Sequence, residues 1–374
     1  MIAEDLLKES SLVLRGGFEV VFGTSEKPAS DCNFHALATN ASSLLSVSSS
    51  DTASSRVQRF RSKRENLVTK SGFSEVPFLE CELLLATVLD VSREKLFLRY
   101  TEELRPVAEE AFRALFFRRM RGEPLAYILE KKEFYGLEFF VDRRVMIPRP
   151  ETEMLVEWVL SKADEYKKWR DSAQGSGFFL ADVGTGSGNI AISVAKNIPS
   201  AKISALDISD GALEVCEKNA VKHGVADRLT IVKSDLLSVF LEGNDGTRSE
   251  IASSPERGGG LLRFARNARN DSGLFIIAAN LPYIGTSKNR YIARSVEDFE
   301  PHEALFGGMD GLEWYRRLFR QISVLKILPR YVIGEIGFTQ GEAILEEIRS
   351  VFPRGRAEVK EDLAGLPRMF VLEI

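Results

Sequence analysis

A short polar and aromatic motif, Asn280-Leu281-Pro282-Tyr283, directly follows the apolar run Leu274–Ala279. A planar nitrogen, such as an amide or the exocyclic amine of a base, is a poor nucleophile because its lone pair is delocalised. The Asn280 side-chain carbonyl and the Pro282 backbone carbonyl could accept its N–H groups and aim the lone pair at a methyl group. Tyr283 offers a ring face for stacking. We predict that Asn280, Pro282 and Tyr283 are catalytic, and that Leu281 joins them in contacting the substrate.

A glycine-rich loop supplies a second chemical signal upstream. It reads Asp182-Val-Gly184-Thr185-Gly186-Ser187-Gly188, between an apolar run and a helix expected to begin near Asn189. Glycines allow a sharp turn and close approach to a ligand, and a helix start offers unpaired N–H groups. Dinucleotide-binding enzymes share such loops. The G-x-G-x-G spacing after an acid is more typical of S-adenosylmethionine binding. The predicted cofactor contacts are therefore Asp182, Gly184, Thr185, Gly186, Ser187 and Gly188.

Two further acids follow the next two apolar runs. Asp207 sits where a ribose diol could be bound, and Asp235 where an adenine amino group could be, with Leu236 packing on the ring. A single aspartate at such a place is more often a helix cap or a loop residue. Three acids, each just past an expected strand, favour a nucleoside site. Asp207, Asp235, Leu236 and Asn280 complete the predicted cofactor contacts.

The elements that must position these residues follow from the alternation of apolar runs and amphipathic segments. The expected strands are Phe178–Val183, Lys202–Asp207, Thr230–Lys233, Leu274–Ala279 and Tyr331–Ile336. Short apolar strands alternating with helices predict a parallel sheet covered on both faces, an α/β Rossmann-like architecture. The acids, the glycine loop and Asn280 all follow strands, so we expect them at one edge of the sheet.

The rest of the chain divides into further segments. Residues 1–75 are rich in Ser, Ala and Thr and end in a basic run, which we interpret as a poorly ordered extension rather than a targeting segment. Residues 76–130 show apolar stripes at helical spacing, and 131–146 alternate as a hairpin. Residues 147–374 form the α/β domain. Within it, 241–272 is a Gly-, Asn-, Arg- and Ser-rich stretch that we expect to be a flexible insertion.

Composition bounds the function. The 374 residues are 44% hydrophobic and 28% charged, which argues against global disorder. No apolar run approaches the roughly 20 residues of a membrane span. The net charge of −4 provides no general attraction for nucleic acid. Three cysteines and three histidines lack metal-ligand spacing, so we expect no metal site.

With these motifs in place, the chain resembles the release-factor glutamine methyltransferase family from Val76 to Ile374. The resemblance also rests on segments at residues 122–126, 147–153, 300–308, 334–337 and 340–341. It implies a helical N-terminal substrate-recognition domain and a class I S-adenosylmethionine-dependent methyltransferase domain. It further implies methylation of the side-chain amide of the Gln in the Gly-Gly-Gln motif of peptide-chain release factors. The segment Ile147-Pro-Arg-Pro-Glu-Thr-Glu153 is the most family-specific.

The resemblance places cofactor contacts on residues 184–188, Asp207, Leu236 and Asn280. It places substrate contacts on residues 280–283, to which we add Arg149 and Pro150 of the family-specific segment. The family motif is usually Asn-Pro-Pro-Tyr, and here Leu281 replaces the first proline. This removes one fixed backbone angle but keeps both acceptors and the ring.

Two other functions remain open at this point. A nucleic-acid exocyclic-amine methyltransferase would use the same acceptors, and a catalytically silent paralogue could retain only cofactor binding. We expect a monomer with no membrane partner and no direct nucleic-acid substrate. We expect a cytoplasmic location, or a mitochondrial or plastid one if the N-terminal extension is a targeting segment.

Overall fold

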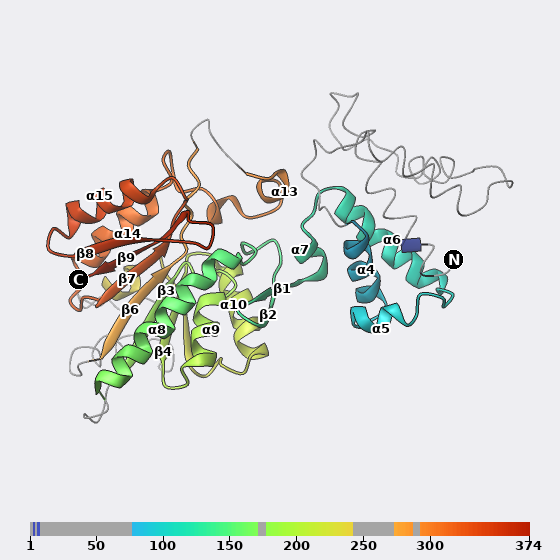
Figure 1. Ribbon diagram of the computed structural model, residues 1–374, viewed down its shortest axis with the longest axis horizontal. Coiled ribbons are helices and arrows are strands. Elements are labelled where there is room, and N and C mark those ends of the chain that lie inside the picture. Colours follow the sequence, from blue (N-terminus) through green and yellow to red (C-terminus); the bar gives the residue numbers. More distant parts are fainter. Residues whose placement is uncertain (1–2, 4–5, 8–76, 171–176, 242–272, 287–291) are drawn as a thin grey trace. The chain divides into compact units, whose positions relative to one another are not determined.

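The computed structural model describes residues 3, 6–7, 77–170, 177–241, 273–286 and 292–374 (Figure 1). The chain divides into two compact units. The first comprises Met1–Leu129 and Ala293–Ser295, and the second Glu130–Ile292 and Val296–Ile374. Nearly all of the expected N-terminal extension and of the 241–272 insertion lies outside the described residues. Their expected character therefore stays a prediction, as do the domain limits drawn from the sequence.

The first unit is helical where it is described. Its helices are α4 (Pro77–Val88), α5 (Arg93–Phe97), α6 (Pro106–Met120) and α7 (Leu125–Leu129). Pro106 begins α6 because a missing N–H costs nothing at the first helical position. The helices bury a common apolar core and one ion pair, in which Arg119 donates to Glu80 at 2.7 Å.

The second unit opens with a short antiparallel hairpin of β1 (Lys131–Phe134) and β2 (Leu137–Phe140). A 3-10 turn, η2 (Pro150–Thr152), then leads into α8 (Glu153–Arg170). The sequence places the hairpin correctly but expects a longer one. The two residues of its turn, Tyr135 and Gly136, both have positive φ, as a tight hairpin requires.

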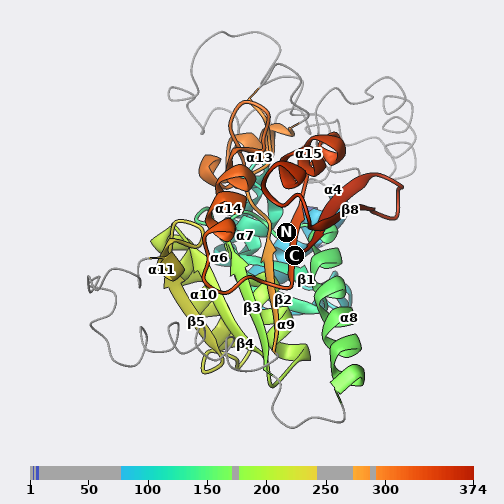
Figure 2. The same cartoon turned by 90° about the vertical axis from the view of Figure 1, so that its left-hand side faces the viewer.

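A seven-stranded sheet forms the centre of this unit, in the order β5-β4-β3-β6-β7-β9-β8. Figure 2 shows β5, β4 and β3 side by side in that order. The strands are β3 (Phe178–Val183), β4 (Lys202–Asp207), β5 (Leu229–Lys233), β6 (Leu274–Ala279), β7 (Tyr331–Glu335), β8 (Arg356–Glu361) and β9 (Pro367–Glu373). The first five are parallel, as the sequence predicts. β8 and β9 add an antiparallel edge that it does not.

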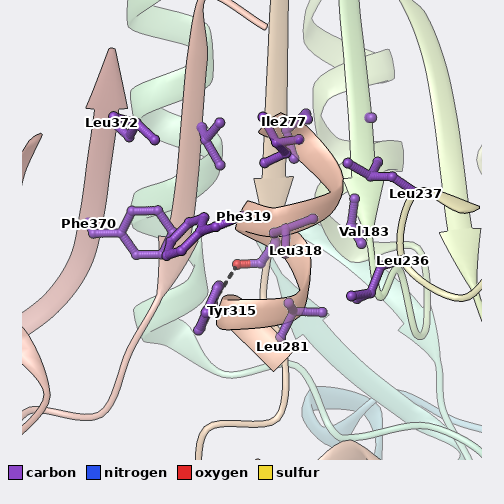
Figure 3. Close-up of a cluster of buried hydrophobic side chains, with 14 of the residues drawn as sticks. Val183, Leu236, Leu237, Ile277, Leu281, Tyr315, Leu318, Phe319, Phe370 and Leu372 are labelled. Carbon is purple, nitrogen blue, oxygen red and sulfur yellow. Dashed lines mark hydrogen bonds between the residues drawn. The ribbon is translucent and has the colours of Figure 1, made fainter. Parts of the chain in front are cut away.

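Helices cover both faces of the sheet, which confirms the Rossmann-like architecture. One face carries α8, α9 (Asn189–Asn197) and α10 (Asp210–Lys222). The other carries α14 (Glu313–Ser323) and α15 (Gly341–Val351), whose apolar side chains share a core with the inner strands. Figure 3 shows Tyr315, Phe319 and Phe370 packed together in this core. Short helical turns, α11 (Ser238–Leu241), α13 (Arg294–Glu297) and η5 (His302–Ala304), lie in the connections.

The strand order locates the place where a ligand would bind. From β3 the chain moves outward to β4 and β5, then returns to β6 on the other side of β3. The connections therefore diverge between β3 and β6, and in open α/β sheets the carboxyl ends of the strands at such a point are where ligands bind. Val183 pairs with Ala279, so the glycine loop and Asn280 leave the sheet side by side.

Within the part of the chain that the structure describes, no helix is long and apolar enough to cross a membrane. Among the same residues, no group of three or more His, Cys, Asp or Glu side chains is arranged to hold a metal ion.

Candidate active site

The glycine loop presents its backbone and hides its side chains. Thr185 and Ser187 are each 2% exposed, whereas Gly184 and Gly186 are partly accessible. Gly184, Gly186 and Gly188 all have positive φ, between 54° and 80°. A Cβ on Gly188 would lie 2.8 Å from Cys216 Sγ, while one on Gly186 would meet nothing within 4 Å. The open side of the loop is therefore glycine backbone, at the start of α9.

Asp182 holds this loop through hydrogen bonds to the loop and to the start of α9. Its Oδ2 accepts the Thr185 hydroxyl at 2.7 Å and the Ala191 backbone N–H at 3.1 Å. The side chain is completely buried, and this burial raises the pKa of Asp182 to about 7. Its Oδ1 has no hydrogen-bond partner among the described residues. Because no part of the carboxyl group is exposed, we infer that Asp182 shapes the loop rather than contacting a ligand directly.

Asp207 lies beside the loop at the end of β4. Its Oδ2 accepts the Gly186 N–H at 2.9 Å, and its Oδ1 accepts the Ser209 N–H at 3.0 Å. Burial raises the pKa of Asp207. Each oxygen keeps a lone pair beyond these bonds, so the carboxylate can still accept from a diol. The neighbouring Ile208 is 52% exposed and offers an apolar surface at this edge. This residue is not among those predicted from the sequence, although its place directly after the strand is a signal that could have indicated it.

Asp235 and Leu236 occupy the end of β5. Asp235 Oδ2 accepts from Arg317 at 2.5 Å, and its Oδ1 is buried without a partner among the described residues. Leu236 has a φ of 55° and is 7% exposed, with its side chain in the core (Figure 3). Arg317, which packs on Trp314, is a partner that the sequence did not predict. The adenine contact expected of this pair stays a prediction.

Asn280 is held by two side chains from distant segments. Its Nδ2 donates to Thr152 Oγ1 and to Glu335 Oε2, each at 3.0 Å. Both acceptors face the nitrogen, so the amide orientation is defined by its bonds. Within the described residues, no donor occupies Asn280 Oδ1. A Cβ added to Gly184 would lie 3.8 Å from the Asn280 backbone oxygen, which shows how closely the glycine loop approaches this motif.

Tyr283 shares the same carboxylate. Its hydroxyl donates to Glu335 Oε1 at 2.8 Å, and burial together with the nearby negative charge raises its pKa well above the usual value. The Tyr283 backbone oxygen accepts from Gln340 Nε2 at 2.9 Å. Glu335 is 1% exposed, and burial raises its pKa against the opposing effect of its hydroxyl donors.

Pro282 and Leu281 take different positions. The Pro282 carbonyl oxygen packs against Gly307, where an added Cβ would lie 2.2 Å away, so only glycine fits at position 307. Leu281 is 3% exposed in the core beside Tyr315 (Figure 3). Any substrate contact by Leu281 would therefore have to use its backbone.

Arg149 and Pro150 belong to a segment fixed at both ends. Glu300, itself 3% exposed, accepts the Ile147 N–H at 3.1 Å and an Arg149 N–H at 2.5 Å. Burial raises the pKa of Glu300, while Arg149 opposes the shift. Pro150 is exposed. At the other end, Thr152 donates to Glu335 Oε2 at 2.5 Å, so the segment that begins near Arg149 ends against Asn280.

Family comparisons agree with this arrangement. Residues 65–129 match the model described as PrmC N-terminal domain, and residues 173–245 match the methyltransferase small domain. The release factor glutamine methyltransferase of Moorella thermoacetica is 36% identical over 301 residues, covering 80% of this chain and 93% of that protein. The chain belongs to the release factor glutamine methyltransferase family. The corresponding family protein of Koribacter versatilis is 33% identical, with 79% of this chain and 90% of that protein covered.

A solved structure at low sequence identity aligns only weakly with this chain. The N-terminal domain of human METTL16 in complex with SAH aligns with a TM-score of 0.43 and 17% identity, covering 69% of this chain and 83% of that one. Family membership therefore rests on sequence. The matched N-terminal model starts at residue 65, before the Val76 at which the sequence resemblance begins.

Proposed function

We propose that this protein methylates the side-chain amide nitrogen of the Gln in the Gly-Gly-Gln motif of peptide-chain release factors, with S-adenosylmethionine as methyl donor. One observation carries the proposal. The Asn280 amide nitrogen is engaged by Thr152 and Glu335, which leaves its Oδ1 as an acceptor on a residue whose backbone lies close to the glycine loop. An acceptor at that place suits a substrate that brings N–H groups.

The residues around the glycine loop fit a nucleoside cofactor. The Gly186 position is open, since a side chain there would meet no atom within 4 Å. Asp207 accepts the Gly186 N–H beside this opening. Asp235 follows the neighbouring strand β5, and its Oδ1 is a buried oxygen that lacks a partner among the described residues. Gly184–Gly188, Asp207 and Asp235 would hold the cofactor. When bound, S-adenosylmethionine supplies a methyl group activated by its sulfonium charge.

The chain's own residues act on the substrate amide. Asn280 Oδ1 and the Pro282 carbonyl oxygen would accept its two N–H groups and so favour a nitrogen whose lone pair is less delocalised. The Tyr283 ring would lie against the planar amide. These are positioning and electrostatic effects, which supply much of the rate in reactions that need no strong base.

The test is transfer of labelled methyl from S-adenosylmethionine to a purified release factor, with the modified residue located by mass spectrometry. We expect label on the Gln of the Gly-Gly-Gln motif and none on a release factor carrying Gln→Ala there. Label on DNA or RNA, with none on the release factor, would instead support the exocyclic-amine reading. Cofactor binding without any transfer would support a silent paralogue.

The Asn280→Ala variant tests the residue behind the proposal. Loss of a group that contacts the reacting atoms typically costs about 100- to 1000-fold in kcat. We expect a loss of that size, with the cofactor Kd from calorimetry changed by less than about threefold. The monomeric state and the cytoplasmic location remain predictions, which sedimentation and cell fractionation would check.

A further inference from the structure

The Glu335 carboxylate receives three side-chain donors from segments far apart in the sequence. Thr152 Oγ1 donates to Oε2 at 2.5 Å, Asn280 Nδ2 donates to Oε2 at 3.0 Å, and the Tyr283 hydroxyl donates to Oε1 at 2.8 Å. Thr152 also accepts from Asn280 Nδ2 at 3.0 Å. The four side chains therefore form one connected network around the buried end of β7.

This network is an expensive way to stabilise a fold. Glu335 is 1% exposed and Thr152 is also 1% exposed. The described residues include no salt bridge to Glu335, so the groups that bond its carboxylate are neutral hydroxyl and amide donors, and the positive charge of Arg368 acts on it only from a distance. Burying a carboxylate without an ion partner is costly even when its hydrogen bonds are made. A well-packed apolar side chain at the end of β7 would serve the core better, which points to a role in the site.

The network fixes the orientation of the Asn280 side-chain amide. Rotating this amide by half a turn would bring Oδ1 against the Glu335 carboxylate and the Thr152 oxygen, and would turn the NH₂ group outward. The observed hydrogen bonds fit the orientation in which Nδ2 faces Glu335 and Thr152 and Oδ1 faces away from them. A substrate amide that brings N–H groups would meet a donor in the rotated form and an acceptor in the observed one.

We propose that Glu335 and Thr152 are positioning residues, which lock the Asn280 amide with its carbonyl toward the substrate and hold the Tyr283 ring in place. This inference rests on the proposed function. Neither residue touches the substrate. Both act through Asn280, and Glu335 also acts through Tyr283.

Variants at these positions separate positioning from stability. Thr152→Val keeps the shape of the side chain but removes the hydroxyl, and Thr152→Ser restores it. Misplacement of a reacting group by about 1 Å can cost about 100-fold in rate. We expect Thr152→Val and Glu335→Gln each to lower kcat by about 10- to 100-fold, with KM and the cofactor Kd changed less than about threefold. Thr152→Ser should stay within about threefold of wild type.

A paired exchange gives the sharpest test. Asn280→Asp places two carboxylates together with no N–H between them, so its turnover should fall by about 100-fold or more. In Asn280→Asp/Glu335→Gln, the new amide at position 335 can donate to the carboxylate at 280 and to Thr152, and can still accept from Tyr283. The number of hydrogen bonds is kept, and the bonds that link position 335 to positions 280 and 152 are reversed. We expect the double variant to recover at least about tenfold over Asn280→Asp.

Ile348→Ala is the matched control. The Ile348 side chain is completely buried in the core of the same unit, on α15, which carries no residue of the network. This variant leaves a cavity away from Glu335, Thr152 and Asn280, so it should lower the melting temperature while keeping kcat within about threefold. Melting temperatures of all variants are measured in parallel.

The outcomes distinguish the two proposals. Absence of wild-type transfer to release factor contradicts the proposed function. Wild-type transfer with unimpaired Glu335→Gln and Thr152→Val overturns the positioning role alone. A double variant no better than Asn280→Asp would also overturn it. So would a loss of rate in Ile348→Ala as large as that in Thr152→Val at a similar drop in melting temperature.

Discussion

Asn219 binds both backbone polar groups of Phe140. Its Oδ1 accepts the Phe140 N–H at 2.7 Å, and its Nδ2 donates to the Phe140 carbonyl at 2.9 Å. The same Nδ2 donates to the Ser187 carbonyl at 2.9 Å. A completely buried side chain on α10 thus joins the end of the β1–β2 hairpin to the glycine loop.

Replacing this side chain should weaken both elements that it joins. Asn219→Ala leaves buried backbone groups of Phe140 and Ser187 without partners, and each such group costs about 1–3 kcal/mol. We expect the free energy of unfolding in urea to fall by about 3 kcal/mol and cofactor affinity to fall with it. Asn197→Ala is the control, since Asn197 Nδ2 donates only to Ser193 of its own helix. Equal losses in the two variants would contradict the bridging role.

The position of the Tyr283 backbone should depend on the absence of a side chain at Gly311. Gly311 has a φ of 83°, and a Cβ there would lie 2.0 Å from the Tyr283 carbonyl oxygen. Gly365 has a φ of 74° and nothing within 4 Å of such an atom. Both alanine variants incur about 1–2 kcal/mol of left-handed strain, but only Gly311→Ala adds a clash worth about 1–3 kcal/mol more.

Urea unfolding and methyl-transfer assays of Gly311→Ala and Gly365→Ala check this difference. Turnover should fall strongly in Gly311→Ala, because the motif from Asn280 to Tyr283 must move, and it should persist in Gly365→Ala. If both variants retained turnover, the tight packing around Tyr283 would not be needed for the reaction.

Asp182 makes stability depend on pH. Burial raises its pKa in the folded state from 3.8 to about 7. The folded protein therefore binds a proton that the unfolded chain has released between these two values. Stability from this residue is fully present below about pH 4 and is lost as pH rises toward 7, by at most about 4 kcal/mol.

The measurement compares wild type with Asp182→Asn, whose side chain does not titrate. As pH rises from 4 to 7, the unfolding free energy of wild type should fall relative to that of Asp182→Asn. Using the difference removes the opposite contribution of surface carboxylates such as Asp142 and Asp310, whose pKa values are lowered by Arg144 and Arg316. A difference that stays constant across this range would mean that Asp182 remains charged throughout.

Leu281 explains how the chain departs from the usual family motif. Its side chain is 3% exposed and packs in the core. Leu281→Pro removes part of this apolar side chain. We expect the unfolding free energy to fall by about 1–3 kcal/mol, against less than about 1.5 kcal/mol for the volume-conserving Leu281→Met. A proline variant as stable as wild type would show that the packing of Leu281 does not matter.

The sequence predicts the parallel strands closely, because each buried strand is a short apolar run that can be recognised from neighbouring residues alone. β3, β4 and β6 have the expected limits, and β5 and β7 differ by one residue at one end. The edge strand β8 alternates charged and partly buried residues with no apolar run, so it gives no comparable signal. In the helical segment expected over residues 76–130, α6 begins at Pro106, where the ring imposes the first helical φ.

The contacts of the site were harder to foresee, because they join residues far apart in the chain. The sequence predicts Asp235 as an adenine contact, but it does not predict the ion pair with Arg317, because a local pattern cannot reveal that partner. Glu335 and Thr152 both stood inside motifs that supported the family resemblance, but nothing in either motif indicated that they meet. Their positions became informative only when the strand order placed β6 next to β7.

The bond between Thr152 and Glu335 spans 183 residues. During synthesis Thr152 leaves the ribosome long before β7 is made. Contacts between residues so far apart in the sequence form late, because a long loop must first close. The glycine loop and its helix can fold while Asn280 still lacks its partners. A nascent chain would thus acquire the elements of the cofactor site first, and would gain a fixed Asn280 amide only when β7 joins the sheet.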